Sequence, residues 1–347
     1  MRINAGRVVV DEVRSRWGVA LGSDSELAAL TQLPEWWNET AVRRDLGLVV
    51  RIYRAGVRPD RVAALQTARG ALGKVGIPIV PLLPSRRGTT LEVIGDRVVE
   101  VESFVPHDGR MNTPIRLRRG AAVLAQVHDV LRNLDLGPAA EDCAYANWID
   151  PADVPSGVRA GIERIRSWAD PQDSALVDNS RRLAGLVSAA ENAMTDARRA
   201  PVPRQLVHGD FWDDNVYLRG ETIVAVTDLD FLGLRPRVDD LALMLYFGEE
   251  EQQLHRPDDR TIEERIGLLA PIVATYASNL QTPLSEAEWR ALPWALARQP
   301  LWGIGHWVPQ LPSEAHAQHQ ARDIVPAVRR ALAIADAPDL WLVGLRS

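Results

Sequence analysis

The sequence predicts an α+β protein of two lobes, a small β-rich lobe over residues 1–103 and a larger, mainly helical lobe over 104–347. Two observations support this prediction. Short β-branched runs dominate the first hundred residues, whereas three- and four-residue apolar spacing dominates the rest. The stretch 104–109, which reads FVPHDG, interrupts both patterns, and we therefore place the lobe boundary there.

The first lobe combines strands with one helix. The run 48–53 is short, apolar and β-branched, which is typical of a strand. Apolar residues at helical spacing over 62–75 predict a helix that Gly76 ends. The runs 90–94 and 97–102 are joined by two residues that begin with glycine, which predicts a β-hairpin.

The second lobe is helical except for one short β segment. Pro114 is suited to the first turn of a helix, and a further helix is expected over 175–199. Residues 205–231 form the β exception, with a hairpin predicted over 216–227. Helices are expected to resume at Asp240.

Composition limits the possible partners. The chain has 347 residues, a quarter of them charged, with a formal net charge of −6. Nucleic-acid binding needs a basic surface, so we expect no nucleic-acid partner. A single cysteine excludes an intrachain disulfide, and no apolar run reaches the roughly 18 residues of a membrane span. The N-terminal residues carry no signal-peptide core. We therefore expect a cytoplasmic protein without a membrane partner.

The residues that carry chemistry gather around the predicted hairpin. A short strand runs into the stretch 208–215, HGDFWDDN, and the hairpin returns to Asp228 thirteen residues after Asn215. Because a hairpin brings its two ends together, Asn215 and Asp228 should lie close in space, with Asp210 facing open space beside them. Such oxygen ligands suit Mg²⁺, and a free carboxylate can orient a hydroxyl and accept its proton. Phosphoryl transfer requires these parts.

This pattern resembles a known superfamily. His208-Gly-Asp210-x₄-Asn215, followed by Asp228 and by Asp240-Leu-Ala, is similar to the motifs of the aminoglycoside phosphotransferase and homoserine/choline kinase-like superfamily. The resemblance covers roughly residues 35–250. It implies a protein-kinase-like fold, with nucleotide bound at the first lobe and a small-molecule acceptor at the second. ATP and Mg²⁺ are the implied cofactors.

The resemblance implies a role for each matched residue. Asp210 would be the catalytic aspartate, His208 would pack beneath its loop, and Asp240 would cap its helix and brace the loop from below. Asn215 and Asp228 would hold the metal ion. Two further assignments concern the metal and the nucleotide. Asp230 would be a second metal ligand, or else a helix cap or loop support, and the backbone of Glu102, Ser103 and Phe104 would meet the adenine edge.

The nucleotide site departs from the family pattern. The only lysine in the sequence, Lys74, ends a predicted helix, so Arg51 occupies the position of the phosphate-clamping lysine. An arginine there either binds phosphate or pairs with a surface acid. The helix glutamate that would pair with that lysine is missing, because Leu65 and Gln66 occupy its region. A glycine-rich phosphate loop is missing too, and only Asn38 matches the family in that segment.

The acceptor site is less defined by sequence. Glu249 and Glu250 begin an acidic cluster that either holds a cationic amine or forms a solvated face. Trp302 and His306 are four residues apart, so on a helix they share one face. They either line an acceptor pocket or pack in the core.

These observations favour an ATP- and Mg²⁺-dependent kinase that phosphorylates a hydroxyl of a small molecule. The favoured acceptor is an aminoglycoside or another amine-bearing sugar, hence a cationic partner. A homoserine- or choline-type amino alcohol is the next alternative, followed by a nucleoside or sugar. A catalytically degenerate pseudokinase that only binds its ligands is the competing class. The oligomeric state is left open.

Overall fold

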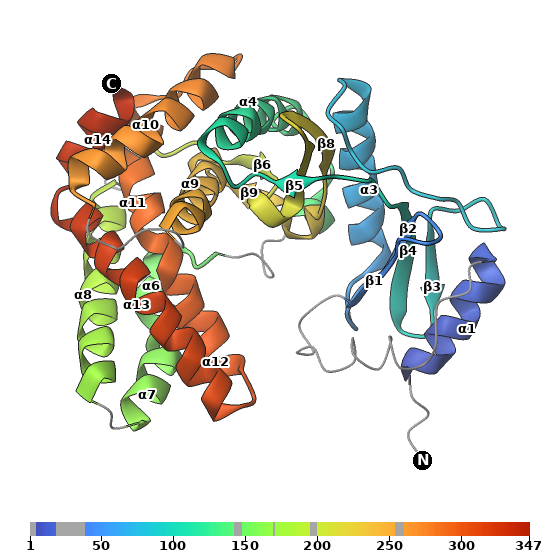
Figure 1. Ribbon diagram of the computed structural model, residues 1–347, viewed down its shortest axis with the longest axis horizontal. Coiled ribbons are helices and arrows are strands. Elements are labelled where there is room, and N and C mark those ends of the chain that lie inside the picture. Colours follow the sequence, from blue (N-terminus) through green and yellow to red (C-terminus); the bar gives the residue numbers. More distant parts are fainter. Residues whose placement is uncertain (1–4, 19–38, 142–147, 169–170, 195–199, 254–259) are drawn as a thin grey trace.

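The computed structural model of the protein describes residues 5–18, 39–141, 148–168, 171–194, 200–253 and 260–347. Figure 1 shows a small sheet with its helices at one end of the molecule and a larger helical body at the other, which confirms the predicted α+β fold with two lobes. The boundary between residues 103 and 104 stays a prediction. In the described ranges, no helix combines the length and apolarity needed to cross a membrane.

The first lobe is built on an antiparallel sheet of four strands in the order β1-β2-β4-β3. The strands are β1 (Glu39–Arg43), β2 (Leu48–Ile52), β3 (Leu91–Ile94) and β4 (Arg97–Ser103). The hairpin between β3 and β4 is confirmed. Its turn uses Gly95 at φ 63°, a left-handed backbone conformation that glycine adopts without steric cost.

Alternation along β2 gives the sheet two different faces. Leu48, Val50 and Ile52 point to one face and pack against Val13 of helix α1 (Ala5–Trp17). Arg51 alternates with them and is therefore turned to the opposite face, where α3 (Pro59–Lys74) lies. The strand thus buries a guanidinium on the side that faces the second lobe.

The helices of the first lobe number two in the described part, where the sequence predicted one. The predicted helix corresponds to α3, and Gly76 follows its end at φ 88°. Helix α1 was missed, although Val13 and Trp17 are four residues apart on its apolar side. Its other neighbours on that side come from distant strands, which a short N-terminal segment does not reveal.

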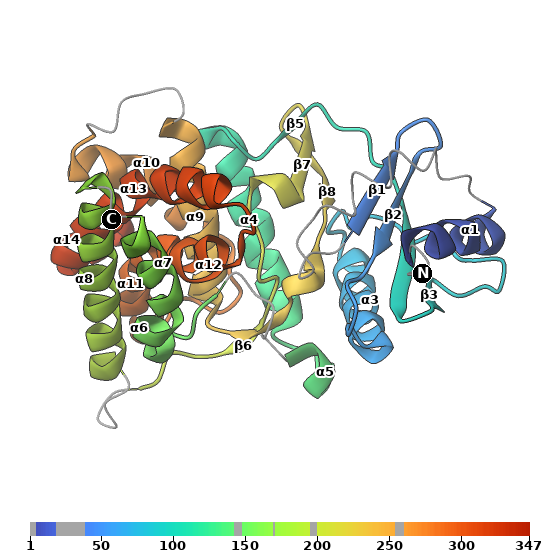
Figure 2. The same cartoon turned by 90° about the horizontal axis from the view of Figure 1, so that it is seen from below.

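The β segment of the second lobe lies between the sheet and the outer helices, beside α4 (Pro114–Leu131) (Figure 2). Strand β6 (Gln205–Val207) pairs with β9 (Gly233–Arg235), and the predicted hairpin is β7 (Val216–Arg219) with β8 (Thr222–Val226). Strand β5 (Gly109–Arg110) joins β7 from the interlobe segment. Thr113 accepts a hydrogen bond from the backbone of α4 and caps the helix that Pro114 begins, as predicted.

The remaining helices form the outer part of the second lobe. Helix α8 begins four residues before the predicted start at 175, and α9 begins three residues before Asp240. The helices are α5 (Pro138–Glu141), α6 (Val154–Gly157), α7 (Arg159–Ser167), α8 (Pro171–Met194), α9 (Arg237–Gln253), α10 (Ile262–Asn279), α11 (Glu286–Trp302), the π-helical turn η4 (Gly303–Trp307), α12 (Val308–Gln310), α13 (Glu314–Asp336) and α14 (Pro338–Arg346).

The π-helical turn η4 is packed against α7 through a glycine. A Cβ added to Gly161 would lie 1.8 Å from the carbonyl oxygen of Ile304. We therefore expect Gly161→Ala to lower the free energy of unfolding by about 1–3 kcal/mol, because the backbones must separate. Gly185, within α8, has no atom within 4 Å of such a Cβ and serves as the control. Gly185→Ala should stabilise the protein by roughly 0.5–1 kcal/mol in denaturant titrations. Equal effects of the two substitutions would contradict this packing.

Candidate active site

A glycine fixes the path of the loop between β6 and β7. Gly209 has φ 84°, and a Cβ there would lie 2.0 Å from the carbonyl oxygen of Phe231. Only glycine satisfies both conditions without rearrangement. The loop therefore lies directly against η3 (Leu229–Phe231), the short turn that follows the hairpin.

His208 is buried beneath this loop, as predicted. Its Nδ1 accepts a hydrogen bond of 3.3 Å from the backbone N–H of Asp210, so Nε2 carries the proton and donates to the carbonyl of Thr227 at 3.0 Å. The ring is thus neutral. Burial is the largest influence, and it lowers the pKa of His208 to about 4.

Asp240 braces the loop from the first turn of α9. Its two carboxylate oxygens accept from the backbone N–H of Gly209 at 2.9 and 3.2 Å, and Oδ2 lies 3.1 Å from His128 Nε2. His128 Nδ1 lies 2.7 Å from the hydroxyl of Tyr276, so the brace extends into α10. The predicted bracing role matches these contacts. The predicted cap was wrong, because Asp240 lies inside α9 and its carboxylate is used by another segment.

Asp210 does not face open space as expected. The residue is 6% exposed, and Asn215 Nδ2 donates to its Oδ2 at 2.7 Å and to its carbonyl oxygen at 2.8 Å. The amide of Asn215 therefore fixes the rotamer of the carboxylate. The side-chain oxygen of Asn215 is the atom that remains for a ligand of another kind.

The far end of the hairpin returns to Asn215, as predicted. The backbone N–H of Thr227 donates to the carbonyl of Asn215 at 2.9 Å. Asp228 follows at φ 61°, the one positive φ among the described residues other than glycine. Arg51 Nη1 donates hydrogen bonds to the carboxylate of Asp228 at 2.9 Å and to that of Asp230 at 2.6 Å. An arginine of the first lobe is thus held between two carboxylates of the second.

Next to Arg51, helix α3 carries a positive charge and strand β4 carries negative charges. The family pattern instead has a glutamate on this helix, which pairs with a lysine on a strand. Arg69 donates to Glu102 at 2.6 Å and to Glu100 at 2.9 Å, and both acids lie on β4. Sequence reasoning missed Arg69 and Glu100. The available signal was the alternation VEVES, which places two carboxylates on one face of an otherwise apolar strand.

Arg61 was also missed, and its side chain connects the lobes by binding backbone carbonyls of the second lobe. From α3, its Nη2 donates to the carbonyls of Asp230 at 2.9 Å and Leu232 at 2.6 Å. Its Nη1 donates to the carbonyls of Ala139 and Ala140, both at 3.0 Å. The turn that carries Asp230 is therefore tied to the helix of the opposite lobe.

The expected adenine edge is partly engaged within the protein. The backbone N–H of Ser103 donates to Pro81 at 3.0 Å, and that of Phe104 donates to Gly47 at 2.8 Å. These two donors are not available to a base, which corrects the prediction for them. The side chain of Glu102 is buried and directed to Arg69. Asn38 lies outside the described residues.

Glu249 belongs to neither of the two predicted environments. It is 3% exposed and forms a two-point ion pair with Arg265 of α10, so it is neither solvated nor open to an acceptor amine. A periodic sequence does not show that the partner lies sixteen residues away on the next helix. The side chain of Glu250 lies outside the described part.

Aromatic rings of the second lobe stack in pairs. Trp302 and His306 stack with ring centroids 4.7 Å apart, at the junction of α11 and η4, and both are half-buried. Burial, followed by the charge of Arg54 from the first lobe, lowers the pKa of His306. Trp212, two residues after Asp210, packs on Phe247 at 4.3 Å, a pair that sequence reasoning missed.

The donor set fits a divalent cation. Asp228 and Asp230 offer carboxylate oxygens, and Asp228 is the more exposed, at 28% of its side chain. In the connected group, four carboxylates (Glu100, Glu102, Asp228 and Asp230) face two guanidiniums (Arg51 and Arg69), which leaves two formal negative charges. Hard oxygen ligands with excess negative charge suit Mg²⁺. Within the described ranges, no cluster of three or more histidine, cysteine or acidic side chains forms a metal site by itself.

Known proteins share this arrangement. A profile described as the phosphotransferase enzyme family (APH) matches residues 29–289, about three quarters of the chain. No curated protein sequence matches at a significant level.

Solved structures share the fold. An amicoumacin kinase in complex with AMP-PNP and Ca²⁺ superposes with a TM-score of 0.62 and 14% identity, with 92% of each chain covered. A microcompartment-associated aminopropanol kinase gives 0.58 and 17%, with 86% of this chain and 87% of that one covered. An aminoglycoside phosphotransferase from Alicyclobacillus acidocaldarius gives 0.56 and 16%, with 97% and 95% covered.

The neutral state of His208 makes stability depend on pH. Its pKa is about 4 in the folded protein and 6.5 for an unperturbed histidine, so the unfolded chain binds the extra proton first. The histidine contributes its full stabilisation above pH 6.5, and up to about 3 kcal/mol is lost as the pH falls toward 4. We expect denaturant titrations to show this slope, and His208→Gln to flatten it.

The exposed His316 provides the control for this measurement. His316→Gln should leave the pH profile of the unfolding free energy as in the wild type. A profile that is equally steep in His208→Gln would contradict the buried neutral ring.

Proposed function

The chain belongs to the phosphotransferase enzyme family, and we propose that it transfers the γ-phosphate of ATP to a hydroxyl of a small molecule. It is a small-molecule phosphotransferase, as the motif around His208 and Asp240 predicted. The observation that carries the specific reaction is the position of Asp210, held by Asn215 beside the carboxylates that Arg51 joins.

In this proposal Asp210 acts on the acceptor. Its carboxylate is fixed by one hydrogen bond from Asn215 Nδ2 and lies in a loop braced by Asp240. It orients the acceptor hydroxyl and accepts its proton as the oxygen attacks the γ-phosphorus, while the bond from that phosphorus to the β–γ bridging oxygen breaks and ADP leaves. Rigid placement is what the loop contributes, because positioning supplies much of the rate in phosphoryl transfer.

The metal and nucleotide are held from both lobes. We assign Asp228, Asp230 and the side-chain oxygen of Asn215 to Mg²⁺. When bound, Mg²⁺ neutralises negative charge on the phosphates. Arg51 is assigned to the phosphates, which it can bind through two parallel hydrogen bonds. Its present carboxylate partners then pass to the metal, so the guanidinium moves from one set of oxygens to another.

An amine-bearing alcohol is the acceptor that we propose, with an aminoglycoside or amino sugar favoured and an amino alcohol next. The solved structures that share the fold include an aminopropanol kinase and an aminoglycoside phosphotransferase. Since Glu249 is neutralised by Arg265, we assign the amine to the aromatic faces instead. Trp212, Phe247 and Trp302 offer aromatic rings that attract a cation.

A pseudokinase is the second candidate, and one observation favours it. Arg51, which would bind phosphate, is engaged by two neighbouring carboxylates. A protein that binds a nucleotide without turnover would keep this arrangement. Release of ADP from Mg·ATP, measured across a panel of amino sugars, amino alcohols, nucleosides and sugars, separates the two candidates.

Removing the carboxylate of Asp210 tests the catalytic assignment. We expect Asp210→Asn to lower kcat about 10²–10⁴-fold, because an amide cannot accept the hydroxyl proton. Nucleotide affinity and melting temperature should stay as in the wild type. Asp214→Asn is the matched control, since Asp214 lies in the same loop with 43% of its side chain exposed. A turnover unchanged by Asp210→Asn would rule out this mechanism.

Arg51 gives a separate test of the nucleotide site. Arg51→Ala should weaken binding of a non-hydrolysable ATP analogue roughly tenfold or more, because a charge-assisted phosphate contact is lost. Binding of Mn²⁺ alone should become stronger, since Asp228 and Asp230 lose their competing cation. Titration calorimetry measures both constants. A nucleotide affinity equal to that of the wild type would refute the role.

A further inference from the structure

We propose that Glu102 is a positioning residue that holds Arg51 in the orientation required by the nucleotide phosphates. The inference rests on the proposed function and extends it to a side chain of β4. Glu102 lies on β4, where Arg69 of α3 holds its carboxylate. This carboxylate orients Arg51 of the neighbouring strand β2.

The guanidinium of Arg51 has one buried nitrogen, Nε, that makes no hydrogen bond within the described part of the chain. Its Nη1 is used by Asp228 and Asp230. The nearest carboxylate oxygen paired with Nε is Oε1 of Glu102, at 3.9 Å. This separation is an ion pair but not a hydrogen bond, and less than 1 Å of movement would close it.

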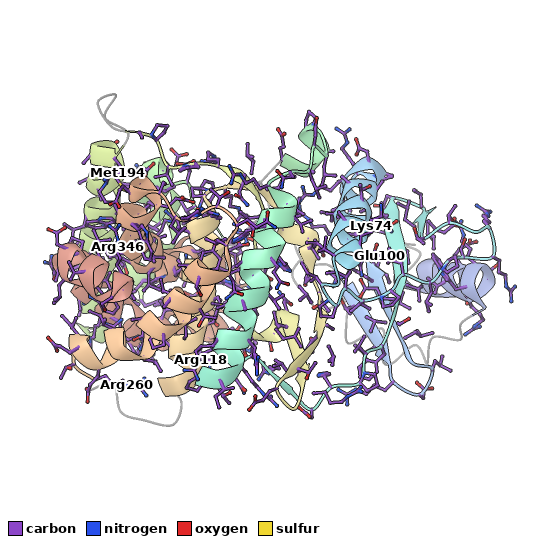
Figure 3. The ribbon with its side chains drawn as sticks, turned by 90° about the horizontal axis from the view of Figure 1, so that it is seen from above. Lys74, Glu100, Arg118, Met194, Arg260 and Arg346 are labelled. Atoms are coloured by element: carbon purple, nitrogen blue, oxygen red, sulfur yellow. The ribbon has the colours of Figure 1, made fainter. Side chains whose placement is uncertain are left out.

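The carboxylate of Glu102 is held in place by its neighbours. The residue is 4% exposed, and the same Oε1 accepts from Arg69 Nη2 at 2.6 Å. Arg69 is held in turn by Glu100, which also accepts from Tyr53 and Gln66, each at 3.0 Å. Figure 3 shows Glu100 beside the helix that ends at Lys74. The carboxylate of Glu102 is thus anchored to α3 and not free to follow Arg51.

Nη1 of Arg51 changes partners in the proposed reaction. There, Asp228 and Asp230 pass to the metal and Nη1 passes to phosphate. The guanidinium then loses both hydrogen bonds that fix it now. If Glu102 binds Nε, the two Nη atoms of the planar guanidinium stay directed at the phosphates. The guanidinium can then rotate only a little. Glu102 therefore lowers the entropy cost of binding rather than touching the nucleotide.

The test is a double-mutant cycle on nucleotide affinity. We expect Glu102→Gln to weaken binding of the Mg²⁺ complex of a non-hydrolysable ATP analogue roughly fivefold, measured by titration calorimetry. In the Arg51→Ala background the same substitution should have no further effect, because the residue it positions is gone. In turnover assays the loss should appear in KM for ATP and leave kcat within about twofold.

A matched variant separates positioning from support of the fold. Glu100→Gln removes a carboxylate that also binds Arg69 and lies opposite Arg51 in the ladder, but forms no ion pair with the Arg51 guanidinium. It should lower the melting temperature and weaken nucleotide binding clearly less than Glu102→Gln does. Should Glu102→Gln fail to fold, Glu102→Asp replaces it, since the shorter side chain keeps the charge but withdraws from Arg51 Nε.

The outcomes are distinct. An equal loss of affinity from Glu102→Gln with and without Arg51 would overturn the inference, because Glu102 would then act on the nucleotide or on the fold directly. A loss of affinity in Glu100→Gln as large as in Glu102→Gln would overturn it too. A wild-type protein that binds no nucleotide would overturn the proposed function itself, and with it this inference.

Discussion

The structure depends on the ion pair that joins its two lobes, Arg51 with Asp228 and Asp230. Arg51 is turned to the face of the sheet opposite the core beneath α1 and is 7% exposed. Buried charges are costly unless they are paired, and the partners nearest to Arg51 stand on the far lobe. The ion pair therefore ties the sheet of the first lobe to the turn that carries Asp228 and Asp230. Arg61 reinforces this contact by binding the carbonyls around Asp230.

The loop that carries Asp210 is held in a different way. Its backbone N–H groups at Gly209 and Asp210 donate to the carboxylate of Asp240 and to Nδ1 of His208, and both of these side chains are buried. Buried hydrogen bonds of this kind restrict the loop to few arrangements. On the nucleotide side that we propose, Arg51 is shared between two acids. In the proposed reaction, a loop fixed by buried hydrogen bonds and a cation that changes partners thus lie in one site.

What the sequence could predict was local. The hairpin, the end of a helix before Gly76 and the return of the hairpin to Asn215 follow from turn residues and short spacings, and these predictions are confirmed. Helices α8 and α9 begin four and three residues before their predicted positions. What it could not predict were partners distant along the chain. The sequence around Glu249 does not indicate that Arg265 is its partner, and the sequence around Arg69 does not indicate that it binds acids of β4.

Two of the wrong expectations about the site concern exposure. Asp210 is covered by Asn215 of the same motif, and the amides of Ser103 and Phe104 donate to Pro81 and Gly47. Motif spacing locates a residue along the chain, but it does not show which buried donors and acceptors the fold pairs with each other.

The backbone of Asp228 has a consequence for how this protein can evolve. A left-handed conformation costs an aspartate about 1 kcal/mol or more, and glycine would adopt it freely. Selection for stability alone would therefore replace the residue, and selection for the reaction would keep it. An aspartate at this position therefore lowers the stability of the fold in exchange for a carboxylate that the proposed reaction uses. A descendant freed from its substrate would be expected to lose this carboxylate early, gaining stability as it does so.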